Sequence, residues 1–162
     1  MVTEAELLAH TENKINGDVR IDNKIVCREK QSTYCYINQS RHRVAKIDVD
    51  GGLVKDKKVE QCDYLLINWD SHHSFFIELK GSDVRKAISQ IIATLDLLWA
   101  DISNIGICVA HVRIIPTKAP RPDLIHNQRR DLEQRLKQCN GGYHKIKEKL
   151  VDIKVKVMVE TF

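Results

Sequence analysis

The stretch CDYLLINWDSHHSFFIELKG, residues 62–81, decides the fold of this chain. Its two apolar runs, residues 62–69 and 74–80, are separated by the polar sequence DSHH at residues 70–73. Apolar runs of this length that are bounded by turn-forming residues are typical of β-strands. We therefore predict two strands joined by a short turn, which makes them antiparallel neighbours in one sheet.

Three charged residues of this hairpin are expected to lie close together. A turn centred near residues 70 and 71 places Asp63 across from Glu78 or Lys80 on the neighbouring strand. Glu78 and Lys80 are two positions apart on one strand, so their side chains share a face. The spacing thus predicts a cluster of two carboxylates and one ammonium group on one side of the sheet.

The segments before the hairpin are expected to contribute a helix and further strands. Residues 3–14 are predicted to form a short helix that opens with a capping box at Thr3. Short strand-like pieces follow at residues 25–27 and 34–37. Residues 43–49 alternate in part between polar and apolar and end at the turn sequence DGG. With the hairpin, they predict a three-stranded antiparallel meander.

The segments after the hairpin alternate between helix and strand. Ser82 is predicted to cap a helix, because apolar residues recur at helical spacing over residues 84–99. Residues 105–115 are typical of a buried strand, and residues 124–139 of a basic amphipathic helix. Residues 151–159 alternate between apolar and polar, which predicts one final strand.

This order of elements predicts an α/β fold with a mixed central sheet flanked by helices, in a single domain spanning residues 1–162. The composition, 43% hydrophobic and 30% charged, provides enough apolar material for a core. No run of ~18 apolar residues occurs, so no membrane span is expected. The five cysteines are an odd number without a C-x-x-C pair, which favours free thiols in a reducing, cytoplasmic compartment.

The predicted cluster has a chemical consequence. Two carboxylates beside a strongly apolar strand repel each other and lose hydration unless a cation compensates them. Oxygen ligands without cysteine or imidazole suit Mg²⁺, for which Mn²⁺ can substitute. A divalent ion held in this way can activate a water molecule and polarise a phosphoryl group, and a nearby ammonium group can stabilise the developing charge.

The same residues resemble a known signature. Asp63, a gap of fourteen residues and then Glu78-Leu79-Lys80 are similar to the D…ExK motif of the PD-(D/E)XK nuclease superfamily. The family core runs helix, three antiparallel strands, helix and strand, an order that residues 3–115 follow. The resemblance implies a restriction-endonuclease-like core (α-β-β-β-α-β). The proline that usually precedes the aspartate is replaced by Cys62.

The resemblance also implies roles for these residues. Asp63 and Glu78 would bind the metal with help from the Leu79 backbone carbonyl, and Lys80 would assist the attacking water. Many members add a glutamate from the first helix. Here the candidates are Glu4 and Glu12, which share a helical stripe.

A further family motif is only partly present. Some exonuclease branches carry Gln-x-x-x-Tyr on the helix after the lysine. This chain has Gln90, but Thr94 replaces the tyrosine. Gln90 is equally explained as a polar residue that flanks the buried face of the helix.

Positive charge is concentrated in places along the chain, whose net charge is +4. The candidates for contacts with a DNA backbone are Lys57, Lys58, Arg85, Arg129 and Arg130. Solvated faces of a sheet and a helix explain such clusters equally well.

The expected activity is that of a Mg²⁺-dependent endo- or exodeoxyribonuclease, acting as a homodimer or within a larger nuclease or defence complex. An alternative is a catalytically silent member of the fold that binds nucleic acid or protein. A second alternative is that Asp63, Glu78 and Lys80 form an ordinary salt bridge at a sheet edge.

Overall fold

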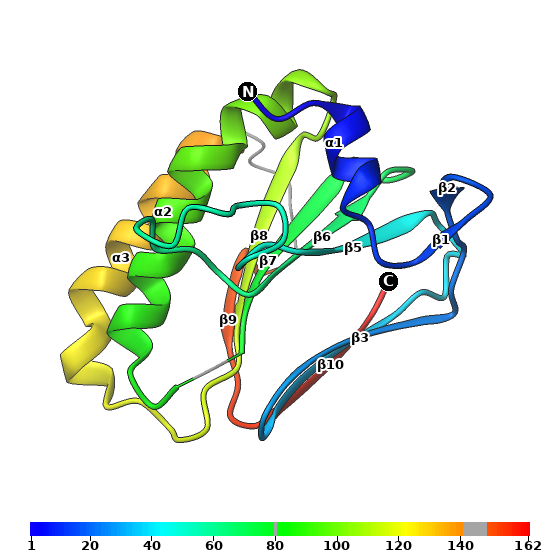
Figure 1. Cartoon of the computed structure of the whole chain (residues 1–162). Helices are drawn as coiled ribbons and strands as arrows, with labels where there is room; N and C mark the ends of the chain where they lie inside the picture. The colour runs from blue at the N-terminus through cyan, green and yellow to red at the C-terminus, as the bar shows by residue number, and fades with distance from the viewer. Residues whose placement is uncertain (80, 141–148) are drawn as a thin grey trace.

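A computed structural model describes residues 1–79, 81–140 and 149–162 (Figure 1). The described part of the chain is a mixed α/β structure with three helices and three sheets. The elements are α1 (Glu4–Ala9), β1 (Lys14–Ile15), β2 (Asp18–Val19), β3 (Lys24–Glu29), β4 (Ser32–Ile37), β5 (Val44–Asp48), β6 (Tyr64–Asn68), β7 (His73–Glu78), α2 (Val84–Asn104), β8 (Val109–Ile114), α3 (Pro122–Cys139), β9 (Val151–Ile153) and β10 (Val157–Thr161).

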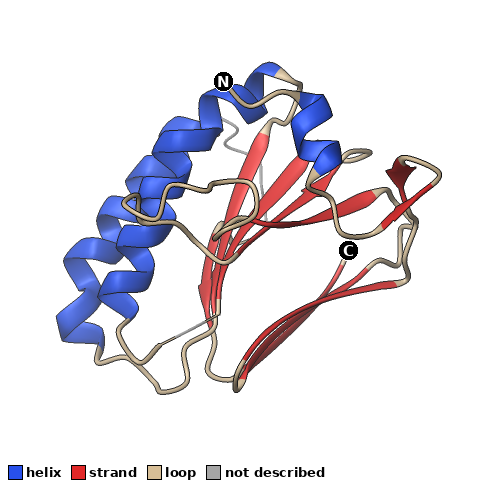
Figure 2. Ribbon diagram, viewed as in Figure 1, coloured by secondary structure: helices blue, strands red, loops and turns tan. Residues whose placement is uncertain are grey.

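The central sheet has five strands in the order β5-β6-β7-β8-β9. β5, β6 and β7 form the predicted antiparallel meander, whereas β8 and β9 join it in parallel. Helices α2 and α3 lie side by side on one face of this sheet (Figure 2). The predicted mixed sheet flanked by helices is therefore confirmed.

The turn of the β6–β7 hairpin lies where the sequence placed it. Asn68 pairs with His73, which leaves residues 69–72 as the turn, and Tyr64 pairs with Ile77 at the other end. His72 takes a left-handed conformation with φ of 61° to close this turn. The register that aligns the charged residues therefore follows from a turn centred between residues 70 and 71.

The two faces of the five-stranded sheet carry separate cores. Leu65, Ile67 and Phe76 face the helices, and we call this side the helix face. Leu66 and Phe75 point the other way, toward the three-stranded sheet β10-β4-β3, and we call this side the inter-sheet face. The side chains of β6 therefore alternate between the two faces. Both cores are apolar enough to hold the layers together.

The final alternating segment does not form the single strand that we predicted over residues 151–159. β9 pairs with β8 in the five-stranded sheet, whereas β10 pairs in parallel with β4 in the three-stranded sheet. Lys156, with φ of 64°, turns the chain between them, and its backbone N–H donates to the carbonyl of Pro116. The chain therefore crosses from one sheet to the other at this point.

Two predicted helix boundaries are also wrong. The predicted helix over residues 3–14 opens with the expected capping box at Thr3 but ends at Ala9. Thr11 then bridges to Ile47 of β5, so tertiary pairing ends the helix early. α2 is capped by Asp83 rather than Ser82, because the Asp83 carboxylate accepts from the backbone N–H groups of the first helical turn.

No helix in the described ranges is both long enough and apolar enough to span a bilayer.

Candidate functional site

Asp63 and Glu78 lie at the same end of the central sheet. Asp63 directly precedes β6 and Glu78 is the last residue of β7, so the register of the hairpin brings them opposite each other. The backbone N–H of Leu79 donates to Asp63 Oδ2 over 2.8 Å. Asp63 alternates with Leu65, and Glu78 with Phe76, so both acids belong to the helix face.

Both carboxylates are deeply placed. Asp63 is 6% exposed and Glu78 is 0% exposed, and the neighbouring Leu79, whose side chain packs into the inter-sheet core, is also fully buried. Burial of two carboxylates in this way is costly unless their surroundings favour the charged form. The Leu79 N–H is one such favourable neighbour, because a hydrogen bond to an ionised oxygen is a strong one.

Helix α2 holds the chain just before Asp63. The Thr94 hydroxyl accepts from the backbone N–H of Cys62 over 2.8 Å and donates to the carbonyl of Gln90 over 2.7 Å. Gln90 Nε2 donates to the carbonyl of Gln61 over 3.1 Å. Gln90 and Thr94, the two positions of the incomplete family motif, thus both fix the approach of the main chain to Asp63.

Negative charge accumulates at this end of the sheet. Burial raises the pKa of the Cys62 thiol, and the charges of Glu78 and Asp63 raise it further. Burial also raises the pKa of the Asp48 carboxyl, with additional contributions from Glu12, Asp50 and Asp63. A region that disfavours further anions is one that favours a bound cation.

Lys80 is the candidate ammonium group, and the candidate metal ligands are Asp63, Glu78 and the Leu79 carbonyl. Lys80 lies outside the described residues. Within the ranges described, no three His, Cys, Asp or Glu side chains converge so that they could hold a metal ion. The predicted set has two carboxylates and a backbone carbonyl. These are hard oxygen donors, which fit Mg²⁺ in chemistry. The backbone of Leu79 is fixed beside these ligands because its N–H donates a hydrogen bond to Asp63.

The two accessory glutamates occupy different places. Glu12 lies beyond the end of α1, and its carboxylate pairs with Lys46 Nζ over 2.9 Å. Lys46 is opposite Leu66 in the sheet, so this pair belongs to the inter-sheet face rather than to the face of Asp63 and Glu78. Glu4 lines a pocket beside the β6–β7 turn, at the other end of the hairpin. The structure therefore does not bring Glu4 together with the predicted acids.

The basic candidates are spread over three elements. Lys57 and Lys58 are exposed on the loop between β5 and β6, and Arg85 is exposed in the first turn of α2. Arg130 is exposed on α3, whereas Arg129 is half-buried and pairs with Glu133 over 3.2 Å. Lys57, Lys58 and Arg85 come from segments adjoining the strand ends that carry Asp63 and Glu78.

No protein-family model, curated protein or solved structure matches this chain.

Sequence reasoning missed two features of the site. The support that Thr94 gives to Cys62 was hidden, because a threonine within an amphipathic helix carries no signal of its tertiary partner. The proximity of Asp48 to Asp63 was also missed, although the place of Asp48 at the end of a strand paired with β6 could have indicated it.

Proposed function

We propose that this protein is a metal-dependent nuclease of the PD-(D/E)XK type, acting on DNA. The observation that carries the proposal is the position of Asp63 and Glu78, opposite each other on one face at one end of the sheet, with the Leu79 N–H on the Asp63 carboxylate. A structural salt bridge would not require two carboxylates to be buried at the same point.

The arrangement of elements supports a restriction-endonuclease-like core. Apart from β1–β4, which come between α1 and β5, the elements α1, β5, β6, β7, α2 and β8 follow the order α-β-β-β-α-β. In this core the catalytic acids come from the ends of the second and third strands. Asp63 and Glu78 occupy those ends here.

The residues divide the work of phosphodiester hydrolysis among them. Asp63, Glu78 and the Leu79 carbonyl would hold Mg²⁺ or Mn²⁺, which when bound supplies an activated water and a polarised phosphoryl group. The Leu79 N–H fixes one oxygen of Asp63, so that its orientation is set before a substrate arrives. Lys80 is assigned to the attacking water by its place in the motif.

The exposed cations suit a DNA backbone. Four of the candidates are exposed and accessible to phosphates: Lys57, Lys58, Arg85 and Arg130. Arg129 instead forms an ion pair with Glu133, which partly neutralises its charge. A homodimer, a larger nuclease or defence complex and a cytoplasmic location stay predictions from the sequence.

One observation favours a second candidate function. Asp63 and Glu78 are 6% and 0% exposed, so access to them is narrow. A silent member of the fold, which binds DNA without cutting it, needs no such access. The two functions differ in a single measurable property, hydrolysis.

The test is cleavage of plasmid and single-stranded DNA with Mg²⁺ or Mn²⁺. We expect Asp63→Asn, Glu78→Gln and Lys80→Ala to lower the rate by about 10²–10³-fold, the usual loss when one preorganised catalytic group is removed. Asp131→Asn, at an exposed position of α3, is the matched control and should cut normally. Circular dichroism checks that each variant is folded.

Two results would decide against the proposal. Cleavage that persists unchanged in both Asp63→Asn and Lys80→Ala would remove the assigned roles. DNA binding without cleavage by the wild type, at any metal concentration, would establish the silent module instead.

A further inference from the structure

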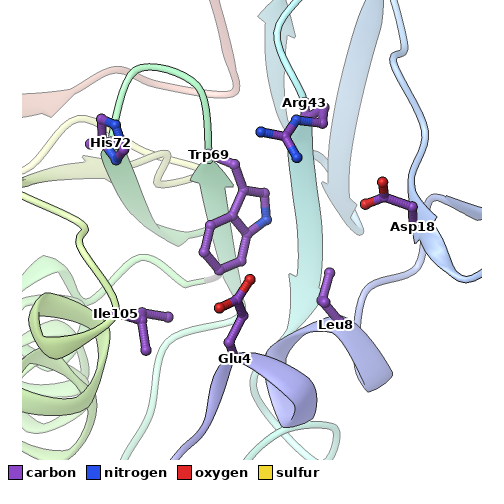
Figure 3. Close-up of a pocket in the computed structure, with 7 residues that line it drawn as sticks. All are labelled: Glu4, Leu8, Asp18, Arg43, Trp69, His72 and Ile105. Carbon is purple, nitrogen blue, oxygen red and sulfur yellow. The ribbon is translucent and has the colours of Figure 1, made fainter.

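The edges of the two larger sheets differ in how well they are protected from another chain. The five-stranded sheet ends at β5 and β9, and the three-stranded sheet ends at β3 and β10. The edge of β5 is covered, because Thr11 bridges to Ile47 in this strand. Leu8 of α1 and Asp18 of β2 also lie around the start of the strand, near Arg43 (Figure 3). β5 is therefore closed to a further strand.

Two more edges carry features that discourage pairing. β9 has only three residues and is followed by the exposed Lys154. β3 carries Lys24 and Arg28, which are both exposed. These cations alternate with Ile25 and Cys27 of the inter-sheet core, so they lie on the outer face of the three-stranded sheet. Short strands and charged side chains are the usual means by which a sheet edge avoids another chain.

The edge strand β10 has no such protection. Its residues, Val157–Thr161, include neither lysine nor proline. Its one charged residue, Glu160, is bound on the inner face by Arg113. Val157 and Val159 are 49% and 55% exposed, and among the described strands β10 borders only β4. An apolar edge of this kind is a ready template for another strand.

The outward main-chain groups of β10 belong to the same residues as its exposed side chains. The Lys156 carbonyl accepts from an N–H of β4, and the Phe162 N–H donates to a carbonyl of β4. Along a strand, successive residues direct their N–H and C=O groups to opposite sides. The even-numbered residues therefore face β4, whereas Val159 and Thr161 direct their N–H and C=O groups to the open edge.

We propose that this protein forms a two-fold dimer in which β10 pairs antiparallel with β10 of a second copy. Val159 lies at the two-fold axis and exchanges both main-chain hydrogen bonds with Val159 of the second copy. The Thr161 N–H donates to the Val157 carbonyl of the second copy. Two three-stranded sheets thus become one continuous sheet. This interface is independent of the proposed nuclease activity.

The charges of the sheet are compatible with a second copy at this edge. The exposed side chains that meet are valine and threonine, so no like charges oppose each other there. On the inner face, Met158 lies opposite Glu160 of the second copy, and each Glu160 is compensated by the Arg113 of its own chain. Lys24 and Arg28 of the two copies are separated by five strand spacings, about 24 Å, well beyond the Debye length of ~8 Å.

The test is sedimentation velocity of the full-length protein over a range of concentrations. A five-residue edge buries less area than the ~1,200 Å² of stable complexes, so we expect a reversible dimer with a Kd of roughly 10–100 µM. Val159→Lys places two ammonium groups at the two-fold axis and should weaken dimerisation by at least about tenfold. Ile15→Lys is the matched control, because Ile15 is a 56% exposed strand residue away from this edge, and it should dimerise normally.

A cysteine at the two-fold axis tests the register. Opposed residues that exchange hydrogen bonds have Cα atoms about 5.5 Å apart, a distance that a disulfide can span. A Cys108→Ser background removes the exposed native thiol. In that background, Val159→Cys should form a disulfide-linked dimer on mild oxidation much faster than Ile15→Cys.

Three results would each overturn the proposal. The wild type could be monomeric at every concentration, Val159→Lys could dimerise as tightly as the wild type, or Ile15→Cys could cross-link as readily as Val159→Cys. Asp63→Asn should leave dimerisation unchanged, so the test stands apart from that of the nuclease.

Discussion

The two faces of the central sheet bury polar groups in different ways. On the inter-sheet face, Arg113 and His111 are buried among apolar residues. Arg113 pairs with Glu160, and His111 pairs with His73. On the helix face, the buried acids Asp63 and Glu78 are confined to one end of the strands. The Arg113–Glu160 pair therefore joins two layers, whereas the acids of the helix face lie together at the end of a single sheet.

The largest expected effect on stability is at the junction of the two sheets. Arg113, 2% exposed, donates from Nε to Glu160 over 2.8 Å, and the Tyr34 hydroxyl donates to the same carboxylate over 2.7 Å. Glu160→Ala leaves a buried guanidinium without its counter-ion. We expect the free energy of unfolding in urea to fall by about 3–5 kcal/mol.

The control for Glu160→Ala is Glu133→Ala. Glu133 pairs with Arg129 at the surface of α3, so its loss should cost about 1 kcal/mol or less. Equal effects of the two substitutions would contradict the view that the inter-sheet face uses its polar groups for stability.

A smaller effect is expected at the acid end of the helix face. Thr94→Val keeps the shape of the side chain but removes the oxygen that accepts from the Cys62 N–H. A buried donor left without a partner costs about 1–3 kcal/mol, measured by urea unfolding. If the nuclease proposal holds, cleavage should also slow, because the segment that carries Asp63 loses its support.

Thr161→Val is the matched control, because Thr161 is exposed on β10. It should change the free energy of unfolding by no more than about 0.5 kcal/mol. A Thr94→Val protein as stable as this control would show that α2 does not hold the acid end.

Stability should depend on pH through His111. Burial, followed by the charges of Arg113 and His73, lowers the pKa of His111 from 6.5 to about 3. As the pH falls below about 6.5, the unfolded chain takes up a proton on this residue and the folded chain does not. Stability is therefore complete above that pH and decreases below it, by up to about 1.4 kcal/mol per pH unit.

The measurement is urea unfolding between about pH 6 and about pH 4.5, a window set by the lowered pKa of His111. The wild type should lose stability more steeply than His111→Asn, which has no imidazole to protonate. Parallel slopes for the two proteins would exclude a neutral, buried His111.

The smallest effect is expected at the turn, which belongs to neither face. Arg43 Nη2 pairs with Asp70 over 2.7 Å, and the Arg43 guanidinium lowers the pKa of the Asp70 carboxyl. Because both side chains are partly exposed, Arg43→Ala should cost only about 0.2–1 kcal/mol at neutral pH. The difference should vanish in acid as Asp70 becomes protonated below its ordinary range. A larger loss would place the turn among the main stabilising contacts.

The sequence predicted best those features that depend on neighbouring residues. The β6–β7 hairpin follows from two apolar runs around a polar turn, and its register places Asp63 opposite Glu78. The capping box at Thr3 is equally local. These features could be predicted because each residue and its partner lie within one short segment.

Features that depend on distant partners could not be predicted. The alternation of residues 151–159 looks the same on both sides of Lys156, and only the strands already present decide which sheet receives each half. The separation of Glu4 from Asp63 depends on where α1 packs. The burial of the acids likewise depends on elements far along the chain.

The crossing at Lys156 has a consequence for the order in which the molecule is built. β10 completes the three-stranded sheet by pairing with β4, and Tyr34 meets Glu160 across 126 residues of chain. During synthesis, β3 and β4 emerge early but must wait for β10 before their sheet is complete. Closing so long a loop is slow, and β4 has an unpaired edge while the residues between β4 and β10 are being synthesised.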